Sequence, residues 1–394
     1  MAIAEKIRRF SETSSWIRKM FEEGAVMKQK YGAANVYDFS LGNPDVPPPA
    51  AFAEALLRVC QNEQSGVHGY MANSGYPFAR EAVAQRISRE QGVRLSGDDL
   101  LMTCGAAGAI NIALKALLNP GDEVILLAPY FVEYDFYIDN HGGVSRVVET
   151  DAQFGLDFAA IERAINAKTK AIVINSPNNP TGQIYSADEL RRLGELLTAA
   201  GKKRGSSIYL ISDEPYRGIV FDGLTCPAVF PAYKESIIVT SHSKDLSLPG
   251  ERIGFAAVHP DIEDKAALLA AMTLANRILG FVNAPALMQR VVAELQDVPA
   301  PAAVYLRRRD VFCRVLQDAG FHFQRPKGAF YLFPSTPIAD DVQFCRMLQE
   351  ERILAVPGRG FGRAGHIRLA FCVSETVIEA AADGFKKVMD KIKG

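Results

Sequence analysis

The middle of the chain repeats one pattern, a short apolar run followed by a segment with helical periodicity, and this repeat constrains the fold more than any other feature. The runs are DEVILLA (122–128), AIVIN (171–175), SIYLIS (207–212) and SIIVT (236–240). They are apolar throughout rather than alternating, which is typical of strands that are covered on both faces. Repeated strand–helix–strand units predict a mostly parallel sheet flanked by helices.

A capping-box pattern marks the helix that follows the second run. Ser186 precedes Glu189 by three residues, so each side chain can bond the backbone N–H of the other. The apolar residues that follow share one face of the predicted helix, namely Leu190, Leu193, Leu196 and Leu197.

The pattern changes after about residue 285. The helical stretches ALMQRVVAEL and VYLRRRDVFCRVLQDAG precede two strand-like segments, GAFYLFP and HIRLAFCVS, and an amphipathic helix is expected over 375–394. We therefore predict an α/β fold with a large domain over 46–285. A smaller α+β domain is expected from 286–394 together with the N-terminal segment 1–45.

Composition limits the partners and the compartment. Of the 394 residues 48% are hydrophobic and 23% charged, as in folded globular proteins, and the net charge of -1 predicts no nucleic-acid or membrane-surface partner. The N-terminal segment has no apolar core of a signal peptide, so a cytoplasmic protein is expected. The longest apolar stretch, 266–288, is interrupted by Asn276, Arg277 and Pro285, which favours a buried or interface helix over a membrane span.

The cysteines are scattered and have no metal-ligand spacing, so no metal site is expected. We expect buried thiols of a reducing compartment. They are Cys60, Cys104, Cys226, Cys313, Cys345 and Cys372.

Polar and aromatic side chains follow each of the four predicted strands. In open α/β sheets ligands bind beyond the carboxyl ends of the strands, so these groups are expected at one edge. They are Phe131, Asn179, Asp213 with Tyr216, and Ser241 with Lys244. Each has an ordinary structural explanation as a core aromatic, turn residue, helix cap or solvated charge, but four such groups at one edge favour a functional site.

These residue types suit one chemistry. A lysine amine can form a Schiff base with an aldehyde cofactor, and a carboxylate can keep a pyridine ring protonated so that it accepts electrons. A phenol and an amide can bond the ring hydroxyl, and an aromatic side chain can stack on the ring. A phosphate tail needs a helix N-terminus and a cation, which Gly105, Ala106 and Ala107 in TCGAAGA and Arg252 can supply.

The chain resembles the fold-type I, class I/II aminotransferases, which use pyridoxal 5′-phosphate (PLP). The motifs that carry the resemblance run from LGNPD (41–45) to HIRLAFCVS (366–374). Between them lie SPNNPTG, SDEPY and SHSK, the last followed by Gly250-x-Arg252-x-Gly254. This resemblance implies the large and small domains of the PLP-transferase fold.

The resemblance also implies a role for each residue. Lys244 is the expected internal-aldimine lysine and proton shuttle, and Asp213 the partner of the pyridinium nitrogen. Cofactor contacts are expected from Tyr216 and Asn179 on the ring oxygen, Phe131 on the ring face, and Ala106, Ala107, Ser241 and Arg252 on the phosphate. Arg368 is expected to bind the substrate α-carboxylate, with Gly42 and Asn179 beside it. Tyr70 matches a tyrosine that reaches the phosphate of the neighbouring subunit, so a homodimer with shared sites is expected.

Some positions depart from the family pattern. The phosphate loop is GAA where many relatives carry a polar side chain, and Pro249 before Gly250 is unexpected. Arg277 lies one residue out of register, relative to Asn283, with the second arginine of aspartate-specific members, so a surface arginine is the better interpretation.

The residues around the expected pocket leave further alternatives open. Trp16, Ile17 and Arg18 can line the substrate pocket or form an ordinary amphipathic helix. We interpret His242 as a spacer.

The predicted function is that of an aminotransferase acting on an L-amino acid and a 2-oxo acid by a ping-pong mechanism. A PLP-dependent carbon–sulfur β-lyase remains the alternative, because fold does not fix reaction. A nicotinamide-dependent oxidoreductase is disfavoured because no GxGxxG follows a strand. A PLP-fold DNA-binding regulator is disfavoured because no helix-turn-helix pattern precedes LGNPD.

Overall fold

The computed structural model describes residues 3–12, 16–62 and 65–393. Its centre is a seven-stranded sheet in which only β8 runs antiparallel to its neighbours. In order across the sheet the strands are β2 (Leu100–Thr103), β8 (Gly254–Val258), β7 (Ser236–Ser241), β6 (Tyr209–Asp213), β5 (Thr169–Asn175), β3 (Glu123–Ala128) and β4 (Val144–Glu149). The predicted mostly parallel sheet is confirmed.

The four apolar runs of the sequence form adjacent strands at the middle of the sheet, β3, β5, β6 and β7. Nearly all their residues are buried, which confirms that continuous apolar runs indicate strands covered on both faces. Because these strands are parallel, their carboxyl ends meet at one edge.

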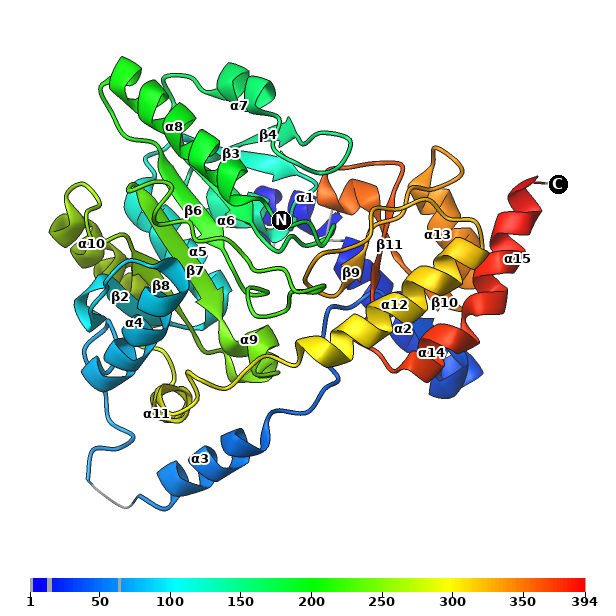
Figure 1. The fold of residues 1–394 in the computed structure, drawn as a ribbon, viewed down its shortest axis with the longest axis horizontal. Helices are drawn as coiled ribbons and strands as arrows, with labels where there is room; N and C mark the ends of the chain where they lie inside the picture. Colours follow the sequence, from blue (N-terminus) through cyan, green and yellow to red (C-terminus); the bar gives the residue numbers. More distant parts are fainter. Residues whose placement is uncertain (1–2, 13–15, 63–64, 394) are drawn as a thin grey trace.

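Helices cover both faces of this sheet (Figure 1). One face packs against α5 (Gly105–Leu117), α6 (Glu133–Asn140) and α10 (Lys265–Ile278). The other packs against α3 (Ala50–Cys60), α4 (Pro77–Gln91), α7 (Phe158–Ala164), α8 (Ala187–Arg204) and α11 (Ala286–Ala293). The predicted capping box opens α8, where Ser186 and Glu189 bond each other's backbone N–H, and the apolar face of the helix is buried.

A second group of elements lies beside this sheet, on the right in Figure 1. β1 (Tyr37–Asp38) pairs in parallel with β10 (Ile353–Leu354), and β12 (Ile367–Ala370) pairs antiparallel with β11 (Val356–Pro357) and β9 (Tyr331–Leu332). An aromatic-rich cluster centred on Phe39, Phe312, Phe330 and Phe385 joins them. The surrounding helices are α2 (Trp16–Tyr31), α12 (Ala302–Asp318), α13 (Asp341–Glu350), α14 (Glu375–Ala380) and α15 (Ala382–Lys393).

The predicted boundary at residue 285 stays a prediction. The helix that follows it, α11, packs against α3 and α4, which precede the boundary. The long connection from α11 to α12 then leads into the second group of elements (Figure 1).

Three local expectations need correction. The C-terminal segment forms two helices rather than one, because the helical pattern is interrupted at Ala381. Gly384 then lets α15 lie close to the Ile353 side chain. Cys60 is exposed at the end of α3, and Cys104 and Cys226 are half-buried, so the expectation of uniformly buried thiols is wrong. The apolar stretch 266–288 is divided between α10 and α11 by a turn, and no helix among the described residues is long and apolar enough to cross a membrane.

Candidate active site

The carboxyl edge of the central strands opens into a cavity of about 360 Å³ between the two groups of elements. The residues to which the resemblance assigns a role all line it, except Tyr70. The lining includes Gly42, Ala106, Ala107, Phe131, Asn179, Asp213, Tyr216, Ser241, Lys244, Arg252 and Arg368. Residues far apart in the sequence are therefore brought to one place.

Lys244 lies in the short helix α9 (His242–Asp245), directly after β7. Its Nζ donates a hydrogen bond to the Gly42 carbonyl oxygen at 2.6 Å and lies 5.5 Å from the centre of the Phe330 ring. Burial lowers the Lys244 pKa to about 8, and the positive charges of Arg368 and Arg252 act in the same direction. An amine with this pKa is partly neutral near pH 7 and can act as a nucleophile or base.

Asp213 is the last residue of β6 and is buried. Its Oδ2 accepts a 2.5 Å hydrogen bond from the Tyr134 hydroxyl, whereas its Oδ1 is buried with no partner among the described residues. Burial raises the Asp213 pKa to about 7, and the Tyr134 hydrogen bond opposes this shift. An unpartnered buried carboxyl oxygen in a cavity fits a ligand that brings a positively charged N–H group.

Arg368 on β12 is the second buried charge of the cavity. It donates to the Asn179 side-chain oxygen at 3.1 Å and to the Ser40 carbonyl oxygen at 2.6 Å. Its Nε is buried and has no partner among the described residues, and burial lowers its pKa. A guanidinium stays protonated in proteins, so this charge favours binding of a carboxylate.

The start of α5 and the segment after Lys244 form an anion cup. Gly105 has φ of 73°, and a Cβ added there would lie 3.0 Å from the Arg252 guanidinium, so the backbone and the cation approach closely. Ser241 bonds the hydroxyl of Ser243 at 3.0 Å. The unexpected Pro249 accepts a hydrogen bond from Arg252 at 2.9 Å. Helix amides, hydroxyls and a cation together suit a phosphate group.

Several lining residues were missed in the sequence, including Tyr134, Tyr137, Asn175, Ser243 and Tyr331. Tyr134 follows Phe131 by three residues, so the start of a helix would have placed the two on one side, and their rings are in edge contact at 5.6 Å. Tyr331 lies in GAFYLFP, a segment predicted as a strand without a preferred face. Its hydroxyl lies 2.8 Å from that of Tyr216.

The remaining candidates lie outside the cavity. Tyr70 is 94% exposed. Arg277 is exposed and lines a separate cavity with Asn73 and Arg80, so the surface interpretation stays a prediction. Trp16 is half-buried against an apolar cluster that includes Phe361, whose ring faces Arg368 at 4.8 Å. The side chains of Ile17 and Arg18 lie outside the described residues.

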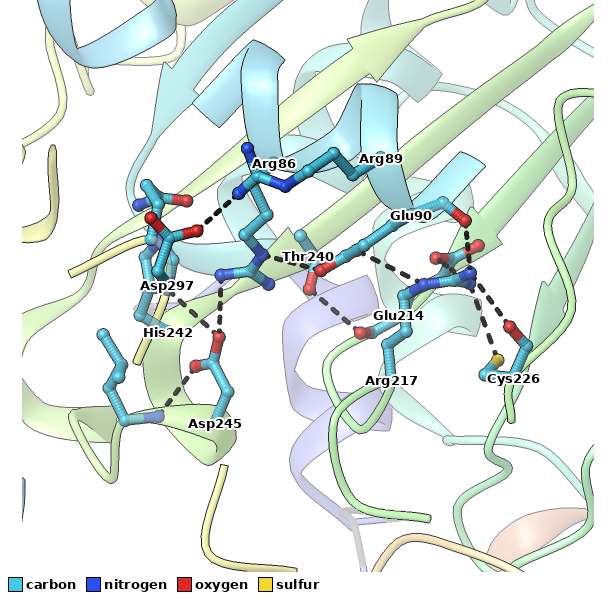
Figure 2. A network of polar contacts seen from close by, with 12 residues as sticks. Arg86, Arg89, Glu90, Glu214, Arg217, Cys226, Thr240, His242, Asp245 and Asp297 are labelled. Carbon is cyan, nitrogen blue, oxygen red and sulfur yellow. Dashed lines mark hydrogen bonds and ion pairs between the residues drawn. The ribbon is translucent and has the colours of Figure 1, made fainter. Parts of the chain in front are cut away.

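A charged network of residues that do not line this cavity connects the segments that carry Lys244 and Asp213 (Figure 2). Asp245, beside Lys244, pairs with Arg86 of α4 at 3.3 Å, and Arg86 pairs with Glu90 at 2.8 Å. Glu90 pairs with Arg217 at 3.3 Å, which in turn bonds Glu214, the neighbour of Asp213, at 3.0 Å.

His242 belongs to the same network and has a role as a partner. It is fully buried, and its Nδ1 lies 3.2 Å from Asp245, whose ionised carboxylate can only accept. It therefore helps to fix the turn that carries Lys244, which is more than the spacer that we expected.

One edge of this sheet carries a lysine with a lowered pKa, a buried carboxyl group and a group of anion-binding residues. Together they define the class of enzyme that binds an aldehyde cofactor through a lysine. The sequence matches the family described as "Aminotransferase class I and II" over residues 34–385. The chain belongs to this family, whose members use PLP, and it is an aminotransferase.

Several aminotransferases are similar to this chain over most of its length. An aspartate/prephenate aminotransferase of Thermus thermophilus is 33% identical over 89% of this chain and 90% of its own length. An aspartate aminotransferase of Geobacillus stearothermophilus is 31% identical over 92% and 93%. Among solved structures, an aminotransferase of Eubacterium rectale has a TM-score of 0.96 at 37% identity and full coverage of both chains. The Thermus thermophilus aspartate aminotransferase with maleate has a TM-score of 0.87 at 28% identity, covering 98% of this chain and 100% of that chain.

Proposed function

We propose that this protein transfers the amino group of an L-amino acid to a 2-oxo acid in two half-reactions. In the first, the amino acid gives up its amino group and leaves as an oxo acid; in the second, another oxo acid takes the group. The observation that carries this proposal concerns two buried atoms, Asp213 Oδ1 and Arg368 Nε, which have no partner in the described part of the chain. Their residues line one cavity with Lys244. One suits a protonated ring nitrogen and the other a carboxylate.

The cofactor-binding residues act by position and charge. PLP, when bound through Lys244, supplies a ring that accepts the electrons released at the substrate Cα. Asp213 holds the proton on the ring nitrogen, and Tyr216 and Asn179 donate to the ring oxygen. The amides of Ala106 and Ala107, with Ser241 and Arg252, hold the phosphate, and Phe131 packs on the ring.

The substrate-binding residues orient one bond. Arg368 holds the α-carboxylate with Asn179, and the Gly42 loop closes the other side of that group. Lys244 then removes the proton at the substrate Cα and returns it on the cofactor side. Its lowered pKa supports this role, because a base that works near pH 7 must be partly neutral there.

The proposal includes a homodimer in a cytoplasmic location. Tyr70 is exposed on this chain, which suits a residue that completes the partner's phosphate cup. The location stays a prediction from the sequence. The carbon–sulfur β-lyase alternative is not favoured, since the similar proteins are named as aminotransferases.

The test is the absorption spectrum of the protein loaded with PLP, before and after addition of amino acids in a pool. We expect a visible band that shifts to shorter wavelength without release of ammonia and returns when an oxo acid is added. Ammonia release without need for an oxo acid would overturn the transfer reaction in favour of the lyase.

A further inference from the structure

Tyr331 makes a hydrogen bond that the proposed reaction does not require. It lies on β9, in the second group of elements, whereas Tyr216 follows β6 of the large sheet. The two hydroxyl oxygens are 2.8 Å apart, both side chains are buried, and their rings meet edge to face at 5.7 Å. The bond therefore joins the two groups of elements directly inside the cavity.

The Tyr331 side chain is tightly enclosed. A Cβ added to Gly42 would lie 1.9 Å from the Tyr331 hydroxyl, so the Gly42 loop closes one side. The Arg368 guanidinium lies 4.7 Å from the centre of the Tyr331 ring. The hydroxyl is therefore held where it points at Tyr216.

Each phenol has one proton, so one of the two must donate in this bond. Burial raises the pKa of both phenols, and the positive charge of Arg368 opposes this effect. The guanidinium lies 4.7 Å from the centre of the Tyr331 ring, and a cation in this position favours loss of the Tyr331 proton. The more acidic phenol is the better donor. If Tyr331 donates, Tyr216 keeps its own proton for a ligand in the cavity.

We propose that Tyr331 is a positioning residue, which donates to Tyr216 and so aims the Tyr216 proton at the ring oxygen of the cofactor. The inference rests on the proposed function, in which Tyr216 contacts that oxygen. Hydrogen bonds in a chain polarise one another, so the donor to Tyr216 strengthens the bond from Tyr216 to the ring. A stronger bond stabilises the deprotonated ring oxygen and lowers the pH at which the visible band of the bound cofactor titrates.

The direction of the hydrogen bond between the two phenols decides whether the midpoint pH rises or falls when Tyr331 is replaced. With Tyr331 as donor, Tyr331→Phe weakens the Tyr216 bond to the ring, and the midpoint pH of the visible band rises. With Tyr216 as donor, the same change frees the Tyr216 proton for the ring, and the midpoint falls.

The experiment is a spectrophotometric pH titration of the PLP-loaded parent, Tyr331→Phe and Tyr233→Phe. Tyr233 is a matched control, because it is buried and its hydroxyl donates to the Ile208 carbonyl at 2.8 Å, outside the cavity. We expect the midpoint of Tyr331→Phe to rise, with a roughly two- to tenfold larger proton-binding constant, as for the loss of one modest hydrogen bond. The midpoint of Tyr233→Phe should equal that of the parent.

The outcomes separate this inference from the function on which it rests. A parent protein with no visible band would overturn both. A parent with a band, and a Tyr331→Phe midpoint that is unchanged or lower, would overturn this inference alone. Thermal unfolding of both variants checks the fold, and a midpoint shift of equal size in Tyr233→Phe would assign the effect to a general structural change and also overturn it.

Discussion

Gly42 shows how little room this cavity leaves at a single residue. The carbonyl oxygen of Gly42 accepts from Lys244, and the space beside its Cα is filled by the Tyr331 hydroxyl. Neighbouring carbonyls also accept hydrogen bonds, that of Ser40 from the site residue Arg368 and that of Leu41 from the Cys372 thiol. Any shift of this short loop therefore moves the partners of several site side chains at once.

We predict that Gly42→Ala lowers kcat/KM by roughly ten- to a hundredfold. The added methyl group would overlap the Tyr331 hydroxyl, and the shift that makes room for it costs about 1–3 kcal/mol. Steady-state kinetics with the best amino donor measures the effect. The matched control is Gly201→Ala in α8, where an added Cβ would make only ordinary contacts at 3.4 Å and beyond. Equal kinetics for Gly42→Ala and the parent would show that the loop moves freely.

A second residue-scale prediction concerns Asp213 in the cofactor-free protein. Its pKa of about 7 lies above the ordinary value for an aspartate, so between about pH 4 and pH 7 the folded state holds a proton that the unfolded chain has lost. The free energy of unfolding must then fall as pH rises through this window, with a slope of up to about 1.4 kcal/mol per pH unit.

Urea unfolding at several pH values measures the free energy of unfolding. This free energy should fall less steeply with rising pH in Asp213→Asn than in the parent. Asp188→Asn, which changes an exposed carboxyl on α8, should keep the parental slope. A parental slope in Asp213→Asn would mean that Asp213 does not hold this proton.

A site residue could be predicted from the sequence only where a local pattern, such as a preceding apolar strand, marked its position. Lys244, Asp213 and Asn179 each follow a strand that is apolar throughout, so their shared edge followed from the parallel sheet. Tyr331 could not be placed that way, because its strand is short and belongs to a different group of elements. Its contact with Tyr216 joins residues 115 positions apart, and no local pattern encodes it.

At the scale of elements, the strands that were predicted are those buried on both faces. The edge strand β4 was not predicted, because most of its residues are exposed. β2 and β8 are buried but were also not predicted, because they are short runs inside segments that carry other signals. Helix ends with side-chain caps, such as that of α8, were also predictable. The break at Ala381 was not, because the sequence there favours helix on both sides.

The helix α4 is the element on which the charged network depends. Arg86 and Glu90 are one turn apart on this helix, and through them it holds the Lys244 turn on one side and the Asp213 loop on the other (Figure 2). Glu90 is the only carboxylate drawn there that pairs with both Arg86 and Arg217. Its charge balances two largely buried guanidinium groups.

We predict that Glu90→Gln lowers the free energy of unfolding by about 1–3 kcal/mol, because it weakens the charge-assisted hydrogen bond to Arg86 and removes the ion pair with Arg217. Urea unfolding of the loaded enzyme measures this change. Asp297→Asn is the control, since Asp297 pairs with Arg89 of the same helix at the exposed surface, where an ion pair contributes about 0–1 kcal/mol. Equal losses in the two variants would contradict a special role for the buried part of the network.

At the scale of the whole molecule, the surface around Tyr70 is suited to a second copy of the chain. The segment that follows Tyr70 is bonded to the end of α10, through Asn73 to the Val282 carbonyl and Asn276 to the Asn73 carbonyl. Tyr70, Leu274 and Ile278 in this region are 94%, 47% and 56% exposed. Exposed apolar side chains that gather in one region are typical of an interface.

The proposed shared-site dimer makes a prediction that no monomeric enzyme can meet. Tyr70→Ala and Lys244→Ala should each be nearly inactive, because one lacks the residue given to the partner's cup and the other lacks its own lysine. In a mixed dimer the Tyr70→Ala chain keeps Lys244 and receives Tyr70 from its partner, so one complete site forms. One of the two sites of each mixed dimer is therefore complete, so about half of the parental activity should return in the purified mixed species.

The two variants are mixed by co-expression with different tags, and the doubly tagged species is assayed. The control mixes Lys244→Ala with Asp213→Ala, two residues that line the cavity of the same chain, so no mixed dimer can contain a complete site. Activity in the first mixture and none in the second would place Tyr70 in the neighbouring subunit's site. If the first mixture were as inactive as its parents, Tyr70 would act within its own chain or not at all, and the cavity would be complete in a single subunit.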